Sequence, residues 1–230
     1  MQSSEPQAIG PNHERHVSDD GMALGPTRPR RTLMVFARVP RPGAVKTRLI
    51  PALGADGAAR VYRLLLRRTL IAAARVPEVE RELWCTADPD VAPCATLARR
   101  LGMRFRRQGE GDLGARMAAA FERALGPEGA GPAALIGSDC PGYEPGYLTR
   151  AFRRLEDQTS RLDAVIGPAL DGGYVLVGLR RPAASLFESI PWGTGEVLGR
   201  TREALAAAGL RGAELPALAD IDRPEDLAGH

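Results

Sequence analysis

Short apolar runs alternate with longer, helix-like stretches along most of this sequence, and this alternation restricts the fold more than any other feature. The runs 32–37 and 133–137 are apolar at almost every position and have the length of buried strands. Between them, apolar residues recur every three or four positions, which is the spacing of a helix that buries one face. Strands that alternate with helices build a mostly parallel sheet covered on both faces, so the sequence predicts an α/β protein.

Later in the chain, the tripeptide Asp171-Gly172-Gly173 joins two apolar runs, 164–167 and 174–179. A short, Gly-rich connection between strands is typical of an antiparallel hairpin or of a functional turn. A hairpin of this kind would make the sheet mixed. We therefore expect a three-layer α/β/α sandwich with a mostly parallel, mixed sheet.

The remaining elements follow from the same patterns. Further strands are expected at 82–87, 103–107 and 210–215, and helices at 56–74, 91–100, 112–125 (with Asp112 as N-cap), 147–155, 183–189 and 196–208. In the helix at 56–74, one set of side chains should face the core and three arginines should face solvent. The core set is Val61, Leu64, Leu65 and Ile71, and the solvent set is Arg60, Arg63 and Arg67.

Composition divides the chain into a tail and one domain. Residues 1–31 are rich in Pro, Gly, Ser, Asp and Arg and lack the apolar segment of a signal peptide, so we expect a disordered tail. A chain of 230 residues suits one domain with a tail, and no linker or repeat interrupts the rest. We therefore expect a single domain at 32–230.

Charge and cysteine content limit which partners and which cellular compartment we expect. A net charge of +3 without blocks of like charge predicts no nucleic-acid partner. No apolar run approaches about 18 residues, which predicts no membrane span. Three cysteines without CxxC spacing favour a reducing, cytoplasmic compartment, and neither a disulfide framework nor a zinc site.

The distribution of histidine limits the chemistry. His13 and His16 fall in the expected tail, and His230 is the last residue. The body of the expected domain therefore cannot use Ser-His-Asp, Cys-His or histidine-ligated zinc chemistry. Catalysis there must use carboxylates, lysine, arginine, hydroxyls or a metal with oxygen ligands, which favours Mg²⁺ or Mn²⁺.

Lys46 is the only lysine among 31 basic residues, and it lies in a Pro- and Gly-rich loop after the strand at 32–37. An ammonium is a compact point charge that can approach a phosphate oxygen closely. We therefore interpret Lys46 as a phosphate contact, and as a loop cation it should contribute little to the core. The loop is not that of a P-loop ATPase, because only Gly43 and the pair Lys46-Thr47 match G-x-x-x-x-G-K-[ST].

Polar groups follow expected strands in three places: 38–48, Ser138-Asp139 and 220–222. Ligands bind outside the carboxyl ends of parallel strands, so these segments should meet at one edge of the sheet. Together they would supply cations for phosphates and carboxylates for a divalent ion, which is the equipment for chemistry on a nucleotide.

Structural alternatives stay open for each piece. Asp139 could begin a turn or cap the next helix. Asp222 could be the N-cap of a helix that has Pro224 in its first turn. The turn at Asp171 could serve only to join two strands.

Five segments in order resemble the rSAM/selenodomain-associated transferases, which are mostly uncharacterised GT-A-type nucleotide-diphospho-sugar transferases, often described as glycosyltransferases and in some cases placed in an arsenosugar context. The segments are Phe36-Ala-Arg-x-Pro-x-Pro-Gly-x-Val-Lys-Thr-Arg-Leu49, Gly111-Asp-Leu-Gly-x-Arg-Met117, Ile136-Gly-Ser-Asp-Cys-Pro141, Asp171-Gly-Gly-Tyr174 and Asp220-Ile-Asp-x-Pro-Glu-Asp-Leu227. The resemblance covers about residues 32–228 and implies a GT-A fold. The first and last segments are also similar to those of 2-phospholactate guanylyltransferases and molybdenum-cofactor nucleotidyltransferases.

By this resemblance, the loop cations bind nucleotide phosphates and the strand-end aspartates hold the metal. The cations so assigned are Lys46 and Arg48, and the metal pair is Asp139 and Asp222. We add Arg38 and Gly43 of the same loop to the expected nucleotide-binding set. The expected acceptor pocket consists of Arg116, Gly172, Gly173, Tyr174, Trp192 and Thr194. The expected catalytic residues are Lys46, Asp139 and Asp171, with Asp171 acting on the acceptor as acid or base.

Three functions fit these residues. The first is a glycosyltransferase that moves a sugar from a nucleotide-diphospho-sugar to a small-molecule acceptor. The second is a nucleotidyltransferase that joins an NTP to a phosphorylated or acidic acceptor and releases pyrophosphate, with the same cations and metal. The third is a non-catalytic nucleotide-binding protein, because the Asp-x-Asp pattern of metal-dependent glycosyltransferases is reduced here to Ser138-Asp139-Cys140.

Overall fold

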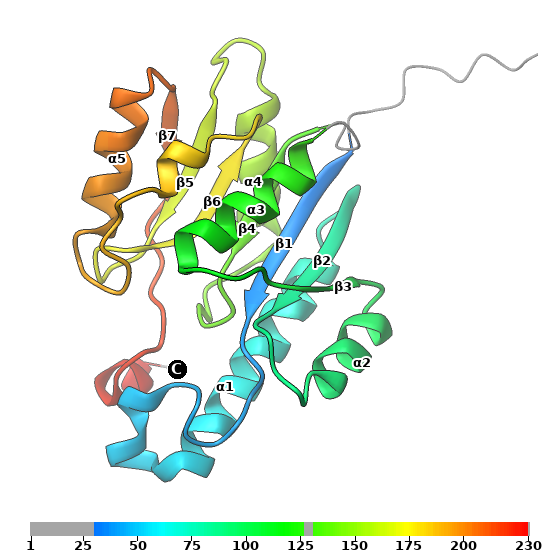
Figure 1. Ribbon diagram of the computed structural model, residues 1–230, viewed down its shortest axis with the longest axis vertical. Coiled ribbons are helices and arrows are strands. Elements are labelled where there is room, and N and C mark those ends of the chain that lie inside the picture. Colours follow the sequence, from blue (N-terminus) through cyan, green and yellow to red (C-terminus); the bar gives the residue numbers. More distant parts are fainter. Residues whose placement is uncertain (1–29, 127–130, 230) are drawn as a thin grey trace, which may run out of the picture.

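A seven-stranded sheet organises the chain in the computed structural model, which describes residues 30–126 and 131–229 (Figure 1). The strand order is β3-β2-β1-β4-β6-β5-β7. The strands are β1 (Arg31–Ala37), β2 (Val79–Cys85), β3 (Arg104–Arg107), β4 (Ala133–Ile136), β5 (Ala164–Pro168), β6 (Tyr174–Leu179) and β7 (Gly212–Glu214). The expected tail at 1–31 lies outside the described residues except for Arg30 and Arg31, and Arg31 begins β1.

The sheet is mixed because a hairpin reverses one strand. β1 pairs in parallel with β2 and β4, and β2 pairs in parallel with β3. β6 lies antiparallel between β4 and β5, while β5 and β7 are parallel. The hairpin predicted around Asp171-Gly172-Gly173 is therefore confirmed, as is the mostly parallel, mixed sheet.

Helices cover both faces of this sheet (Figure 1). They are α1 (Ile50–Ala74), α2 (Ala92–Arg100), α3 (Leu113–Leu125), α4 (Pro145–Glu156) and α5 (Val197–Ala207), with short 3₁₀ helices η1 (Thr47–Leu49), η2 (Ala184–Phe187) and η3 (Pro224–Gly229). Successive residues of β1 belong to two different cores: Leu33 and Val35 pack with α1, α2 and α4, whereas Met34 and Phe36 pack with α3 and α5. This alternation confirms the predicted three-layer sandwich.

One side chain of α1 contradicts the expected burial pattern. Leu64 was expected in the core but is 67% exposed. It lies four residues after Arg60 and three before Arg67, so it shares the solvent-facing side of the helix with these arginines. The helix also begins earlier than expected, at Ile50, across a kink at Gly54 whose φ is 68°.

The other differences are local, and one of them is the strand expected at 210–215, which is only Gly212–Glu214. The helix expected at 183–189 is only the 3₁₀ helix Ala184–Phe187. The strand expected at 82–87 begins at Val79 and ends at Cys85. Asp112 is the N-cap of α3 as predicted, since its side chain accepts a hydrogen bond of 2.8 Å from the Ala115 amide.

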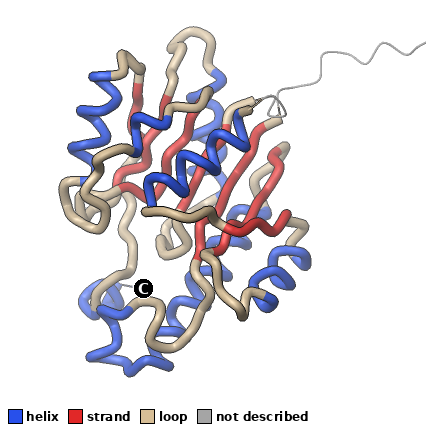
Figure 2. The backbone as a smooth tube through the Cα atoms, in the orientation of Figure 1, coloured by secondary structure: helices blue, strands red, loops and turns tan. Residues whose placement is uncertain are grey.

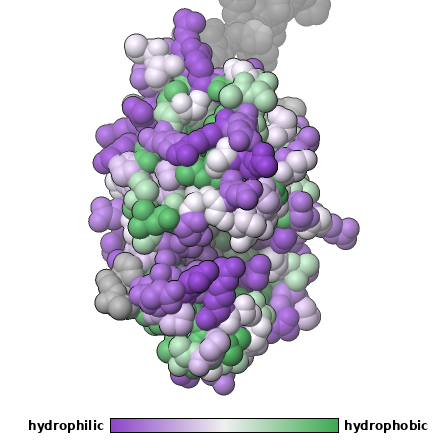
Figure 3. Space-filling model, turned by 90° about the vertical axis from the view of Figure 1, so that its left-hand side faces the viewer, coloured by the Kyte–Doolittle hydropathy of each residue, from purple (hydrophilic) through white to green (hydrophobic). Residues whose placement is uncertain are grey.

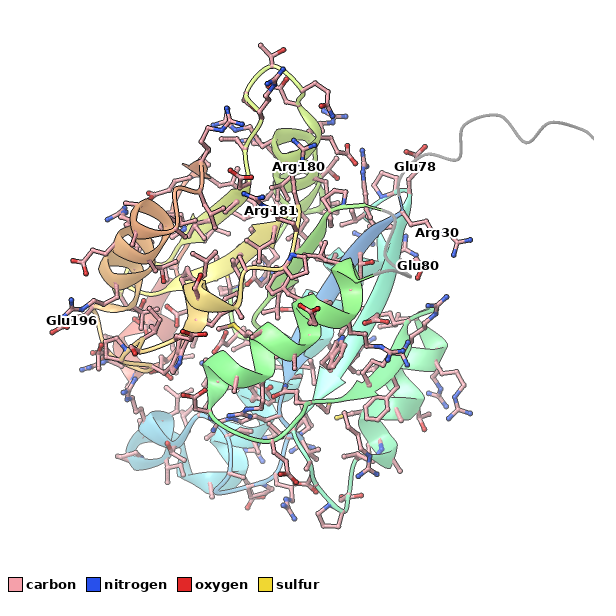
Figure 4. The ribbon with its side chains drawn as sticks, turned by 45° about the horizontal axis from the view of Figure 1, so that its top comes forward. Arg30, Glu78, Glu80, Arg180, Arg181 and Glu196 are labelled. Atoms are coloured by element: carbon pink, nitrogen blue, oxygen red, sulfur yellow. The ribbon has the colours of Figure 1, made fainter. Side chains whose placement is uncertain are left out.

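Charged residues gather at the edge of the sheet where β1 and β2 begin (Figure 4). Arg30 pairs with Glu80 at 3.1 Å, and at the same edge Arg181 pairs with Asp163 at 3.4 Å. Such exposed pairs contribute little to stability. All three cysteines are buried free thiols. Within residues 30–126 and 131–229, no helix combines the length and the apolar character needed to cross a membrane.

Candidate active site

The three strand-end segments meet at one edge of the sheet, as predicted. They line a cavity of about 480 Å³, here called the first cavity. Figures 1 and 2 show why they meet: the loop after β1 and the C-terminal segment lie on the same side of the molecule, beyond the carboxyl end of β1. On the face that carries the C-terminal segment, a band of hydrophilic residues crosses the molecule below its middle, above a lower end of mixed character (Figure 3).

Apolar anchors place the charged residues of this cavity. Leu49 and Ile221 are buried and belong to one hydrophobic cluster. Because Arg48 precedes Leu49 and Asp222 follows Ile221, the packing of the two aliphatic side chains brings the two charges together. The backbone amide of Ile221 also donates to the carbonyl of Asp139 at 3.2 Å, which ties the C-terminal segment to the end of β4.

Lys46 lies at the centre of the charged group. Its Nζ is 3.0 Å from Oδ2 of Asp139 and 3.5 Å from Oδ1 of Asp222. Arg48 also pairs with Asp222. The Lys46 side chain is only 4% exposed, so this cation is more deeply buried than a loop position suggests. The two carboxylates therefore converge on one ammonium.

The backbone at Lys46 is strained. Its φ of 46° and ψ of 45° lie in the left-handed region, which costs a residue with a Cβ about 1–2 kcal/mol. Gly43, with φ of 79°, makes the preceding turn possible without that cost. Strain of this kind in non-glycine residues clusters at functional sites, where the surrounding structure maintains it.

Tyr62 is a site residue that sequence reasoning missed. Its hydroxyl lies 2.7 Å from Oγ of Ser138 and accepts a hydrogen bond of 2.8 Å from the Arg38 amide. The phenol comes from α1 and joins the ends of β1 and β4. Burial raises its pKa well above the usual value, so it stays protonated. No spacing in the sequence marks this tyrosine, because its partners are distant in the chain.

The expected acceptor residues are divided between two cavities. Asp171 and Thr194 line a second cavity of about 320 Å³, whereas Arg116 and Tyr174 line the first. Arg48 and Asp222 line both cavities, so the two are adjacent. The second cavity also holds Asp220, whose pKa burial raises to about 6, with further contributions from the nearby carboxylates of Asp171 and Asp139.

The other three expected acceptor residues have packing partners. A Cβ on Gly172 would lie 2.2 Å from the carbonyl oxygen of Gly195, so Gly172 permits close contact between two loops. Trp192 meets the ring of Tyr174 edge-on, with ring centres 6.2 Å apart. The amide of Gly173 donates to Oδ1 of Asp171 at 2.9 Å, which is a turn-forming hydrogen bond. Their roles toward an acceptor stay predictions.

The hydrogen bonds do not show Asp222 as the N-cap of the following helix. The carboxylate of Asp226 accepts hydrogen bonds from the amides of Asp222 and Arg223, at 2.9 and 2.7 Å. The Asp222 carboxylate instead faces Lys46 and Arg48. Asp226 therefore stabilises the turn, and Asp222 is directed to the site.

The residues present fit a divalent cation of the Mg²⁺ type. Asp139 and Asp222 supply hard oxygen ligands that already converge, and their side chains are 39% and 31% exposed. Mg²⁺ is commonly held by one or two carboxylates together with substrate phosphates. Among the described residues there is no cluster of three or more acidic, histidine or cysteine ligands that would hold a metal without a substrate.

Solved structures confirm the fold. A candidate nucleotide-diphospho-sugar transferase from Desulfovibrio desulfuricans is 32% identical over 84% of this chain and 82% of its own, with a TM-score of 0.75. Two more structures are 13% identical and share the fold alone. One is a CMP:2-keto-3-deoxy-manno-octonic acid synthetase complexed with CTP, which covers 87% of this chain and 96% of its own with a TM-score of 0.55. The other is glucosyl-3-phosphoglycerate synthase from Mycobacterium tuberculosis with Mn²⁺, UDP and glucosyl-3-phosphoglycerate, which covers 88% of this chain and 75% of its own with a TM-score of 0.53.

The structural neighbours also include a cytidylyltransferase and a nucleotidyl transferase, and the fold is of the nucleotide-diphospho-sugar transferase type. Among curated proteins, none matches this sequence. A family model matches residues 69–194, which include β2 to β6 and the turn at Asp171. The chain belongs to the bacterial family described as "Uncharacterized protein conserved in bacteria" (DUF2064).

Proposed function

We propose that this protein is a glycosyltransferase that moves a sugar from a nucleotide-diphospho-sugar to a small-molecule acceptor. The observation that carries this proposal is the convergence of Lys46, Arg48, Asp139 and Asp222 at one edge of the sheet, in a cavity of about 480 Å³. Cations next to paired carboxylates suit a diphosphate with its divalent ion. The resemblance to rSAM/selenodomain-associated transferases and the 32%-identical relative support the same assignment.

In this proposal the first cavity binds the nucleotide. Lys46 and Arg48, together with Arg38, which lines the same cavity, neutralise the diphosphate, and the turn at Gly43 holds their loop. When the bond between the sugar and the diphosphate breaks, its electron pair stays on the diphosphate. Fixed cations stabilise that developing charge most effectively in a partly buried site. Asp139 and Asp222 would hold a Mg²⁺ or Mn²⁺ ion, which would supply Lewis-acid stabilisation of the departing diphosphate.

The second cavity would bind the acceptor, because it adjoins the first at Arg48 and Asp222. Asp171 is the proposed base. As the acceptor oxygen attacks the anomeric carbon, its proton passes to the Asp171 carboxylate. Thr194, which lines this cavity, would then contact the acceptor, together with Gly172 and Gly173, which follow Asp171. Trp192 would support Tyr174 through the edge-on contact of their rings.

A nucleotidyltransferase is the second candidate. It is favoured by the similarity of the Lys46 loop and of the segment at Asp222 to guanylyltransferases. In that reaction an acceptor oxygen attacks the α-phosphorus of an NTP, and pyrophosphate leaves with the electron pair. Lys46, Arg48 and the metal pair would serve both reactions, and cytoplasmic placement is proposed for either on the cysteine content.

A thermal-shift panel tests the proposal. The four NTPs and the common UDP-, GDP-, CDP-, ADP- and dTDP-sugars are each added with Mg²⁺, Mn²⁺ or EDTA. A ligand that binds only the folded protein raises its melting temperature with the logarithm of concentration over Kd. A larger shift with one nucleotide-sugar than with its matching NTP supports sugar transfer and names the donor.

The other outcomes separate the alternatives. A shift with an NTP and none with its sugars favours nucleotidyl transfer. A nucleotide that binds without turnover of any acceptor favours a non-catalytic protein. A flat panel in all three metal conditions contradicts the proposal, and the ratio of the Mg²⁺ to the EDTA shift measures the metal dependence.

A further inference from the structure

Arg116 is a cation of the first cavity that stands apart from the others. Its Nε donates to the carbonyl of Asp112 at 3.0 Å, and its Nη1 donates to Oε1 of Gln108 at 3.2 Å. Both acceptors are neutral. Of the five N–H groups of a guanidinium, these bonds use two, so three can donate to a ligand.

Gln108 holds this guanidinium in a fixed position. Its side chain is buried, and Nε2 donates to the carbonyls of Ala37 and Trp84 at 3.1 and 2.9 Å. Since both amide hydrogens bind strand-end carbonyls, Oε1 must point the other way, toward Arg116. The orientation of the amide is thus set by the ends of β1 and β2. A preorganised planar donor is the requirement for bidentate recognition.

The surroundings of Arg116 differ from those of Lys46. Gln108 binds the ends of β1 and β2, and β2 lies on the opposite side of β1 from β4, the strand that leads to Asp139. The lining residues that come from these strand ends, from the segments after β2 and β3 and from the start of α3 are all neutral: Phe36, Ala37, Thr86, Gln108 and Leu113. The other cations of the cavity are Arg38, Lys46 and Arg48, in the loop after β1. A phosphate suits the cationic end, and a flat aromatic base suits the neutral one.

We propose that Arg116 determines which nucleobase the first cavity accepts, by donating two hydrogen bonds to a base that has two adjacent acceptors. This inference rests on the proposed function, because it requires a nucleotide in the cavity. Guanine presents O6 and N7, and cytosine presents O2 and N3. In adenine, N1 and N7 each lie beside the N6 amino group, which is a donor. In uracil, the N3–H group separates the two carbonyl oxygens. Neither base therefore offers two adjacent acceptors to the two N–H groups of the guanidinium.

The test is equilibrium binding of GDP, CDP, ADP and UDP in saturating Mg²⁺ to the full-length protein, measured by calorimetry. GDP or CDP should bind at least about tenfold more tightly than ADP and UDP, since a bidentate arginine discriminates by about this factor or more. The one that binds more tightly names the base. In Arg116→Met this preference should fall to within about threefold.

Two further variants sharpen the result. Arg116→Lys keeps the charge but not the planar fork, so it should lose the preference as well. Arg123→Met is the matched control, because Arg123 is an exposed arginine two turns further along the same helix. It should leave the order of the four affinities unchanged. Melting temperatures without ligand show whether each variant is folded, and the wild-type order tests the inference by itself.

Three results would overturn the inference while leaving the proposed function intact: equal binding of all four nucleotides by the wild type, preference for ADP or UDP, or an equal loss for all four in Arg116→Met. The last would mean that Arg116 contacts the diphosphate, which all four nucleotides share. If none of the four nucleotides binds, the proposed function itself fails.

Discussion

The ammonium of Lys46 lies 3.0 Å from a carboxylate oxygen of Asp139, and the Lys46 side chain is only 4% exposed. The same ammonium is 3.5 Å from Asp222. Lys46 therefore stands at the point where the proposed metal pair converges. In this arrangement the lysine and a divalent ion compete for the same oxygens, unless the lysine moves toward a phosphate when the nucleotide enters.

Lys46→Met should consequently change metal and nucleotide binding in opposite directions. Without nucleotide, Mn²⁺ should bind about tenfold more tightly, because two opposed unit charges 4 Å apart interact by about 1 kcal/mol in water and about 4 kcal/mol near a protein surface. Nucleotide affinity should fall by about tenfold or more, since a charge-assisted hydrogen bond is lost. Electron paramagnetic resonance of free Mn²⁺ measures the first effect. Lys46→Arg, which keeps the charge, should not gain Mn²⁺ affinity, and unchanged Mn²⁺ binding in Lys46→Met would contradict the competition.

Asp139→Asn should separate catalysis from nucleotide binding. The substitution keeps the shape of the side chain and removes one charge of the proposed metal pair, so turnover should fall by about a hundredfold or more. The thermal shift caused by nucleotide in EDTA should persist, because it does not depend on the metal. Asp157→Asn, at the exposed end of α4, is the control. Full activity in Asp139→Asn would remove this residue from the mechanism.

Tyr62→Phe should weaken both the fold and the site. It removes the hydroxyl that joins Ser138 to the Arg38 amide, at a cost of about 1–3 kcal/mol in the free energy of unfolding. Denaturant unfolding measures that loss, and calorimetry should show weaker nucleotide binding. Tyr147→Phe is matched to it, because that hydroxyl donates to the Pro216 carbonyl at 3.1 Å and lines neither cavity. Tyr147→Phe should lose stability alone; equal binding losses in both variants would show that Tyr62 acts only through stability.

Gly172→Ala should be more destabilising than Gly193→Ala. Both glycines have positive φ, 89° and 82°, so alanine costs about 1–2 kcal/mol at either position. A Cβ on Gly172 would also collide with the Gly195 carbonyl at 2.2 Å, whereas at Gly193 no atom lies within 4 Å. Thermal unfolding of the two variants compares the costs. Equal costs would mean that the two loops do not pack as closely as described.

Several features were accessible from sequence because they depend on local pattern. The buried runs at β1 and β4 and the hairpin at Asp171 follow from apolar periodicity and turn composition. The meeting of Lys46, Asp139 and Asp222 followed from a general property of parallel sheets, whose carboxyl ends share an edge. The burial of Leu64 was predicted wrongly, because aliphatic character alone does not say which face of α1 meets the core.

By itself, the sequence determined the class of chemistry: its histidines lie at 13, 16 and 230, its single lysine follows the first strand, and its aspartates follow later ones. Only the tertiary structure decided the contacts, since side chains meet through the packing of segments far apart in the chain. Arg48 and Asp222 are separated by 174 positions and are joined because Leu49 packs with Ile221. Tertiary packing elsewhere in the domain also joins Tyr62 to Ser138 and orients Arg116 through Gln108. It divides the expected acceptor residues between two cavities.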